Sequence, residues 1–183
     1  MTWNMTASQN TPSALSDGDE VRAFQGGDPE AFERLVDRYQ RPILSLGKRM
    51  LGPDDARDLF QDVFLQVHRS LVGLREPDAF RTWLFRIAVR LASRQVKRQP
   101  PVPVALVDLE APERPDTVVS DEQSRSLHQA LRNLPSRQRE VLLLRHFEGL
   151  SHAEVAEVLG IREDAVRASH YQGLRKLRQL LLP

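Results

Sequence analysis

The stretch AFRTWLFRIAVRLASRQVKR, residues 79–98, contains six Lys and Arg side chains and no Asp or Glu. Its apolar residues recur three and four positions apart, a pattern that predicts a helix with one packed face. Arg86, Arg90 and Arg94 follow one another at intervals of four and share a second face, where like charges repel. Two interpretations stay open from these residues alone. The aromatic side chains belong either to a core behind a solvated basic face or to a surface that stacks on unpaired nucleic-acid bases.

Helices are also expected upstream of this stretch, because the apolar residues keep the same spacing and no strand-like alternation competes. Asp28 is a suitable N-cap, and Pro29 is a suitable first residue, for one of them. Prolines punctuate the pattern, so a second helix is expected from Pro42 to Leu51 and a third from Pro53 to Leu71. Residues 17–98 are therefore interpreted as one small helical domain.

An acidic face is predicted on the helix that starts at Pro53, where Asp54, Asp58 and Asp62 stand four residues apart. The letters DDARD also fit the pattern D-D-x-x-D, which holds magnesium and a diphosphate in isoprenoid-synthase-like helical enzymes. Such enzymes need a second acidic motif, which the sequence lacks, and acids are favoured near any helix start. The face, with Gln61 beside it, suits a basic protein partner better, and the magnesium enzyme is kept as an alternative.

Residues 99–119 are interpreted as a linker, because five prolines interrupt any helix there. The linker separates the first domain from a second over residues 120–183, and residues 1–16 are expected to form a flexible tail. The net charge of the 183 residues is only +1, so any attraction to nucleic acid must come from segregated charge. The sequence has no cysteine, no signal sequence and no apolar run of about 20 residues. A cytoplasmic protein with no membrane insertion is therefore expected.

A helix-turn-helix is predicted in the second half, within GLSHAEVAEVLGIREDAVRAS. Ser151 and Glu154 form an S-x-x-E capping box ahead of a short apolar helix. Gly160 suits the sharp left-handed turn that ends this helix, and Val166 begins the apolar face of the next one. A basic helix that only complements its own dipole would explain the C-terminal cations but not this combination, so DNA binding is favoured.

The last helix is predicted to read DNA, since the first turns of a recognition helix face base edges and later cations hold phosphates. The residues expected on bases are Glu163, Arg167, Ala168 and Tyr171, and those expected on the backbone are Arg175 and Lys176. The histidines give no metal signal: His170 lies on the apolar side of the helix, and His146 and His152 lack partners at metal spacing. No metal site and no cofactor are expected.

Two pairs of motifs occur in order along the chain. DARDLFQDVFLQVHRSL is followed by FRTWLFRIAVR, and LPSRQREVLLLRHFEGLSHAEVAEVLGI is followed by AVRASHYQGLRKLR. The first pair is similar to region two, and the second to region four, of the extracytoplasmic-function group of bacterial sigma factors. The resemblance implies an all-α protein of two small domains, a region two helical bundle and a region four helix-turn-helix. It also implies a promoter-specificity subunit of RNA polymerase that is not an enzyme. A helix-turn-helix regulator that works without polymerase remains an alternative.

The resemblance implies which residues make which contacts. The clamp helices of the largest polymerase subunit would bind Asp58, Leu59, Gln61, Asp62, Val63 and Gln66. The opened minus-ten element would contact Arg75, Phe80, Arg81, Trp83, Arg86, Arg90 and Arg94. The last helix would read the minus-thirty-five element, region four would meet the flap of the second-largest subunit, and an anti-sigma factor is expected as an inhibitory partner. His68, Arg162 and Gly173 depart from the family pattern, so a relative's promoter specificity does not transfer.

Overall fold

The computed structural model describes residues 15–98 and 121–181, and within these ranges the chain is all-α, as predicted. The first half contains α1 (Asp17–Gln25), α2 (Pro29–Met50), α3 (Pro53–Ser70) and α4 (Phe80–Arg98). The second half contains α5 (Asp121–Arg132), α6 (Ser136–Leu142), α7 (His152–Leu159) and α8 (Glu163–Leu181). Short helical turns lie between them: η1 (Leu71–Gly73), η2 (Pro77–Ala79) and the π-helical η3 (Leu143–Phe147). The predicted linker, 99–119, and nearly all of the predicted tail, 1–14, lie outside the described residues.

Side chains at the helix starts supply partners for backbone N–H groups that the helix itself leaves free. Ser16, assigned to the tail by the sequence analysis, instead caps α1 in a capping box with Asp19. Asp28 accepts a hydrogen bond from the N–H of Glu30 at 3.0 Å, and Pro29 follows it, as expected.

The break expected at Pro42 is wrong, because α2 continues through it as one helix of 22 residues. Proline removes the hydrogen bond to the preceding turn and costs about 3 kcal/mol inside a helix. Tyr39 lies before the proline, and Ile43 and Leu46 lie after it, and all three are buried in the core. Burying a large apolar side chain contributes about 1.5–3 kcal/mol, so the packing on both sides of Pro42 offsets its cost.

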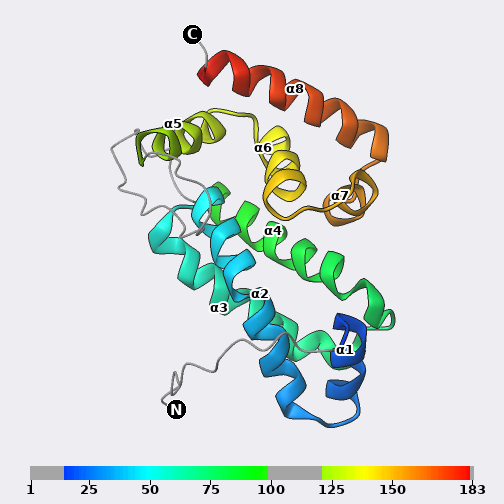
Figure 1. Ribbon diagram of the computed structural model, residues 1–183. Helices are drawn as coiled ribbons and strands as arrows, with labels where there is room; N and C mark the ends of the chain where they lie inside the picture. The colour runs from blue at the N-terminus through cyan, green and yellow to red at the C-terminus, as the bar shows by residue number, and fades with distance from the viewer. Residues whose placement is uncertain (1–14, 99–120, 182–183) are drawn as a thin grey trace.

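One hydrophobic core joins the two halves of the chain. Helix α4 lies between α2 and α3 on one side and α6 and α7 on the other (Figure 1). Its buried residues Phe85 and Val89 belong to the same apolar cluster as Val155 and Val158 of α7. The second half therefore covers one face of α4. Among the described helices, none is both long and apolar enough to cross a bilayer.

Candidate nucleic-acid interface

The basic stretch of residues 79–98 forms α4, and only part of the predicted DNA-binding set faces solvent. Arg86, Arg90 and Arg94 are exposed along one stripe of the helix, as their spacing predicts. Arg75, in the turn before the helix, is also exposed, and Trp83 is partly buried. A continuous stripe of guanidinium groups is the chemistry that binds a nucleic-acid backbone.

The prediction that Phe80 contacts unpaired bases is wrong, because its side chain is 0% exposed. The ring centroid lies 5.6 Å from that of Tyr39, in an edge-to-face arrangement, and 6.0 Å from that of Trp83. Phe80 and Phe85 therefore belong to the core, whereas Trp83 is partly exposed.

The acidic face predicted on α3 exists, but two of the residues assigned to it point inward. Leu59 and Val63 are both 0% exposed, so neither can contact a partner, and that part of the prediction is wrong. They lie four positions apart on the face of α3 that packs against α2 and α4. Their packing fixes the orientation of the exposed Asp58 and Asp62 on the opposite face.

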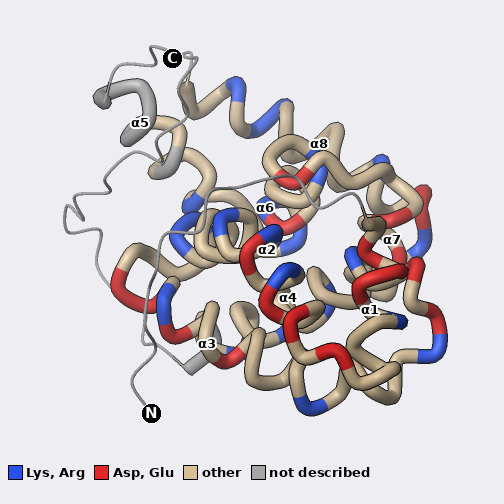
Figure 2. The backbone as a smooth tube through the Cα atoms, turned by 60° about the horizontal axis from the view of Figure 1, so that its bottom comes forward, with Lys and Arg blue, Asp and Glu red and all other residues tan. Residues whose placement is uncertain are grey.

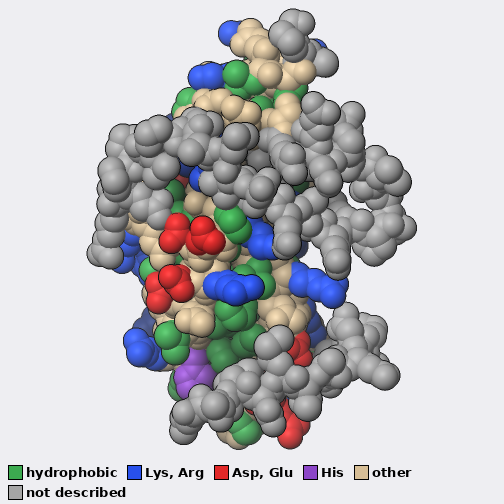
Figure 3. Space-filling view, turned by 90° about the vertical axis from the view of Figure 1, so that its left-hand side faces the viewer, with side chains coloured by type: hydrophobic (Ala, Val, Ile, Leu, Met, Phe, Trp, Pro, Cys, Tyr) green, Lys and Arg blue, Asp and Glu red, His purple; other side chains and the backbone are tan. Residues whose placement is uncertain are grey.

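The exposed side of α3 combines charge with apolar surface. Asp54 and Gln61 are exposed with the two aspartates, Gln66 is partly buried, and the side chain of Leu65 is 54% exposed. The view onto the α3 side of the molecule shows acidic side chains next to hydrophobic and basic ones (Figure 3). In the described part of the chain, no group of three or more His, Cys, Asp or Glu is placed to hold a metal ion.

Two arginines of α4 that were predicted to bind DNA contact groups of the second half of the chain. Oε1 of Glu157 lies 3.0 Å from a guanidinium nitrogen of Arg86 and 3.1 Å from the hydroxyl oxygen of Thr82. The guanidinium of Arg81 donates to the backbone carbonyl of Glu148. Arg81 and Arg86 are therefore already partnered within the chain.

A second polar contact joins α4 to α6. The hydroxyl of Ser93 donates to Oε1 of Glu140 at 3.0 Å, and Arg137 lies 3.2 Å from the other carboxylate oxygen. Glu140 is only 8% exposed, so these partners satisfy a buried carboxylate. Sequence reasoning missed Thr82, Glu140 and Glu157, because no local pattern indicates which acid of the second half reaches a helix of the first.

The helix-turn-helix prediction is confirmed in detail. The hydroxyl of Ser151 accepts a hydrogen bond from the N–H of Glu154 at 3.1 Å, and the Glu154 carboxylate accepts from the N–H of Ser151 at 2.6 Å. Gly160 ends α7 with φ 62° and ψ 39°, the left-handed conformation that glycine adopts without strain. Val166, which is 0% exposed, packs the start of α8 into the core.

The outer face of α8 carries the residues predicted to bind DNA. Arg167, Ala168, Arg175 and Lys176 are exposed, and Tyr171 is 69% exposed. Figure 2 shows Lys and Arg positions, with no acidic ones, along the C-terminal half of this helix.

Glu163 is partly buried at the start of α8. Its carboxylate accepts a hydrogen bond from a guanidinium N–H of Arg167 at 2.6 Å. The acid therefore orients the arginine one turn later.

Three histidines that the sequence analysis treated separately meet in the second half. The Nε2 atoms of His146 and His170 are 2.9 Å apart, and the rings of His152 and His170 have centroids 5.3 Å apart. Burial lowers the pKa of each ring below its usual range, and the nearby Arg145 adds to the effect. Sequence spacing did not predict this cluster, because the fold brings His170 to His146 and His152 from a separate helix.

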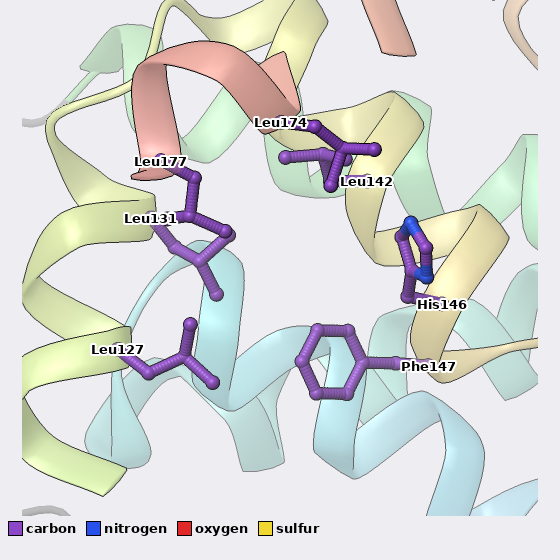
Figure 4. A pocket seen from close by; sticks show the side chains of 7 residues that line it. All are labelled: Leu127, Leu131, Leu142, His146, Phe147, Leu174 and Leu177. Carbon is purple, nitrogen blue, oxygen red and sulfur yellow. The ribbon is translucent and has the colours of Figure 1, made fainter. Parts of the chain in front are cut away.

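An apolar pocket of about 240 Å³ opens beside this cluster (Figure 4). Its lining comes from α5, α6, η3 and α8 and consists of Leu127, Leu131, Leu142, His146, Phe147, Leu174 and Leu177. The guanidinium carbon of Arg49, on α2, lies 4.0 Å from the ring centroid of Phe147 and ties this region to the first half.

Comparison with known proteins identifies the family. Family models described as sigma-70 region 2 and sigma-70 region 4 match residues 35–100 and 124–177. The ECF RNA polymerase sigma-E factor of Haemophilus influenzae is 31% identical over 185 residues, which cover 92% of this chain and 97% of that protein. The chain belongs to the ECF sigma factors of the sigma-70 family. This sigma factor is also 34% identical to the RNA polymerase sigma-H factor of Pseudomonas aeruginosa over 89% of its own length and 92% of the relative's.

Solved structures share the fold of this sigma factor. CnrH in complex with the cytosolic domain of CnrY matches with a TM-score of 0.73 at 23% identity, covering 90% of this chain and 96% of that one. The sigma factor RpoE in complex with the anti-sigma factor NepR from Bartonella quintana matches with a TM-score of 0.65 at 19% identity, covering 82% of this chain and 96% of that one. At these identities the likeness shows the fold alone.

Proposed function

We propose that this sigma factor binds the core of bacterial RNA polymerase and directs it to promoters, where it helps to open the DNA. It works by binding alone, is not an enzyme, and acts in the cytoplasm, where bacterial transcription takes place. The observation that carries the proposal is the separation of charge over three helix faces: the face on α3 is acidic, and those on α4 and α8 are basic.

The α3 face is the proposed polymerase-binding surface. Asp58, Gln61 and Asp62 stand together on a rigid helix whose other side is anchored in the core, with the exposed Leu65 beside them. Carboxylates around an apolar side chain suit a basic helical partner, such as the clamp helices of the largest subunit. Complementary charge there would steer encounter and fix register.

The α4 stripe is the proposed contact with the minus-ten element. Arg75, Arg90 and Arg94 are exposed and can meet phosphates directly, and the partly exposed Trp83 can stack on an unpaired base. Stacking and charge together would trap bases of the opened strand, each stack being worth about 1–3 kcal/mol.

The exposed face of α8 is the proposed reader of the minus-thirty-five element. Arg167, Ala168 and Tyr171 lie in its first turns and can reach base edges, while Arg175 and Lys176 lie further along and can hold phosphates. The apolar pocket of the second half suits a helix of the polymerase flap or of an anti-sigma factor. One structural relative, the sigma factor RpoE from Bartonella quintana, forms a complex with the anti-sigma factor NepR, which supports the same partner class here.

Transcription in vitro with core polymerase and a promoter library tests the proposal. Asp62→Ala is expected to weaken binding to core, whereas Asp37→Ala, which removes an exposed carboxylate from α2, should leave it unchanged. Arg167→Ala is expected to reduce dependence on the upstream element while core binding is retained. A purified chain that fails to bind core, or that binds promoters equally tightly without it, would overturn the proposal and favour an ordinary helix-turn-helix regulator.

A further inference from the structure

At the contact between α7 and α4, polar groups of α4 that could bind a phosphate instead surround the carboxylate of Glu157. Thr82 is only 6% exposed, and its hydroxyl oxygen lies 3.1 Å from Oε1 of Glu157 and 3.0 Å from the carbonyl oxygen of Ala79. The guanidinium of Arg86 donates to the same Oε1 at 3.0 Å. The single hydroxyl hydrogen of Thr82 can point to either oxygen. When it points to Glu157, the hydroxyl and Arg86 both donate to one anionic oxygen, which is the donor set that a DNA phosphate requires.

We infer that Glu157 occupies a phosphodiester-binding position on α4, so that promoter DNA and α7 compete for Thr82 and Arg86. This inference rests on the proposed function of α4 and adds two residues to it. Thr82 becomes a phosphate ligand, and Glu157 becomes an internal competitor from the domain that reads the upstream element.

The rest of the interface holds α7 in this position. Arg81, one position before Thr82, donates to the carbonyl of Glu148, and Ser93 donates to Glu140 of α6. Apolar residues of α7 belong to the same core cluster as those of α4. The carboxylate is therefore delivered by a packed helix and not by a freely moving side chain.

The competition is partial, because the remaining arginines of α4 stay accessible. Arg90 and Arg94 continue the stripe beyond Arg86 and are exposed in this closed arrangement. DNA can meet these two first and gain the Thr82 position only when Glu157 withdraws. The apparent affinity for DNA is then reduced by the fraction of molecules that are closed.

The size of the effect follows from the exposure of the ion pair. The side chains of Arg86 and Glu157 are 46% and 49% exposed, so solvent screens their attraction. Removing the charge of Glu157 is expected to raise the affinity for single-stranded DNA about two- to fivefold. The apolar contacts between the halves remain, so the shift toward the open form is partial.

Glu157→Gln tests the inference, with Glu33→Gln as the matched control that makes the same change in net charge on an exposed site of α2. Because the sequence has no cysteine, cysteines introduced at the exposed Gln40 and Gln179 can carry a fluorescence-transfer pair that reports closure in the full chain. The probe is a fluorescent single-stranded oligonucleotide. We expect Glu157→Gln to lower energy transfer and tighten DNA binding beyond the control.

The charge-swapped double variant Arg86→Glu with Glu157→Arg separates closure from DNA binding. The swap should restore high energy transfer, because an ion pair forms again with the acid on α4 and the arginine on α7. DNA binding should stay weak, because the guanidinium of Arg86 has been removed from α4. If Glu157→Gln leaves both readouts at the level of the control, the inference is overturned. The proposed function is judged separately, by whether the wild-type chain supports transcription with core polymerase.

Discussion

Replacing Phe80 by alanine is expected to lower the free energy of unfolding by about 3–5 kcal/mol, the usual cost of deleting a buried phenyl group. The ring is 0% exposed, and it packs against Tyr39 and Trp83 at centroid distances of 5.6 and 6.0 Å. Domains are stable by about 5–15 kcal/mol in total, so this loss can approach the whole stability of the first half. Urea unfolding followed by circular dichroism measures it.

Phe80→Leu keeps the experiment interpretable if the alanine variant does not fold. Leucine preserves most of the buried volume, so we expect a loss of about 1–1.5 kcal/mol and nearly unchanged binding of a single-stranded oligonucleotide. Arg90→Ala is the reciprocal variant: its exposed side chain predicts a stability change within about 0.5 kcal/mol and a clear loss of DNA affinity. A Phe80→Leu protein of full stability that no longer binds DNA would refute the assignment of Phe80 to the core.

Three further predictions concern packing, capping and pH. Gly47→Ala is expected to destabilise the protein by about 1–2 kcal/mol in urea unfolding, because a Cβ there would lie 3.1 Å from the backbone Cα of Ala56. Ser151→Ala should cost about 1 kcal/mol, because the N–H of Glu154 loses its acceptor, and Ser151→Asp should recover most of it. The pKa of each of the three histidines is lower in the folded chain than its ordinary value of about 6.5 in the unfolded chain. As the pH falls, the unfolded chain therefore takes up protons first, and the free energy of unfolding should decrease between about pH 7 and pH 5. His170→Gln should flatten that dependence in the same unfolding assay, and an unchanged slope would contradict the role of the cluster.

The local features of the second half could be predicted because each depends on neighbours in the sequence. Ser151 and Glu154 are three residues apart and cap one helix, and Gly160 supplies its own left-handed turn. The same holds for the exposed arginine stripe of α4, since helical periodicity alone places residues four apart on one face. These features needed no knowledge of distant contacts.

The errors occurred where contacts far apart in the sequence override a local preference. Pro42 signals a break, but a core face that continues past it holds α2 together. Leu59 and Val63 belong to a motif associated with a partner, yet their apolar side chains pack inward and only their charged neighbours remain outside. The sequence located the motif correctly, but it did not show which of its side chains point into the core.

The amino-acid sequence by itself determined the helical class, the two motif-bearing halves, the helix-turn-helix and the sigma-factor resemblance, because periodicity, capping and turn residues act over a few positions. The tertiary structure alone decided that α7 lies on α4, that Glu157 meets Thr82 and Arg86, and that three histidines share one cluster. The contacts of Glu157 with Thr82 and Arg86 join residues more than 70 positions apart, and that between His146 and His170 joins residues 24 apart. Burial of a common apolar core selects them, and no local pattern in the chain encodes which partner each side chain finds.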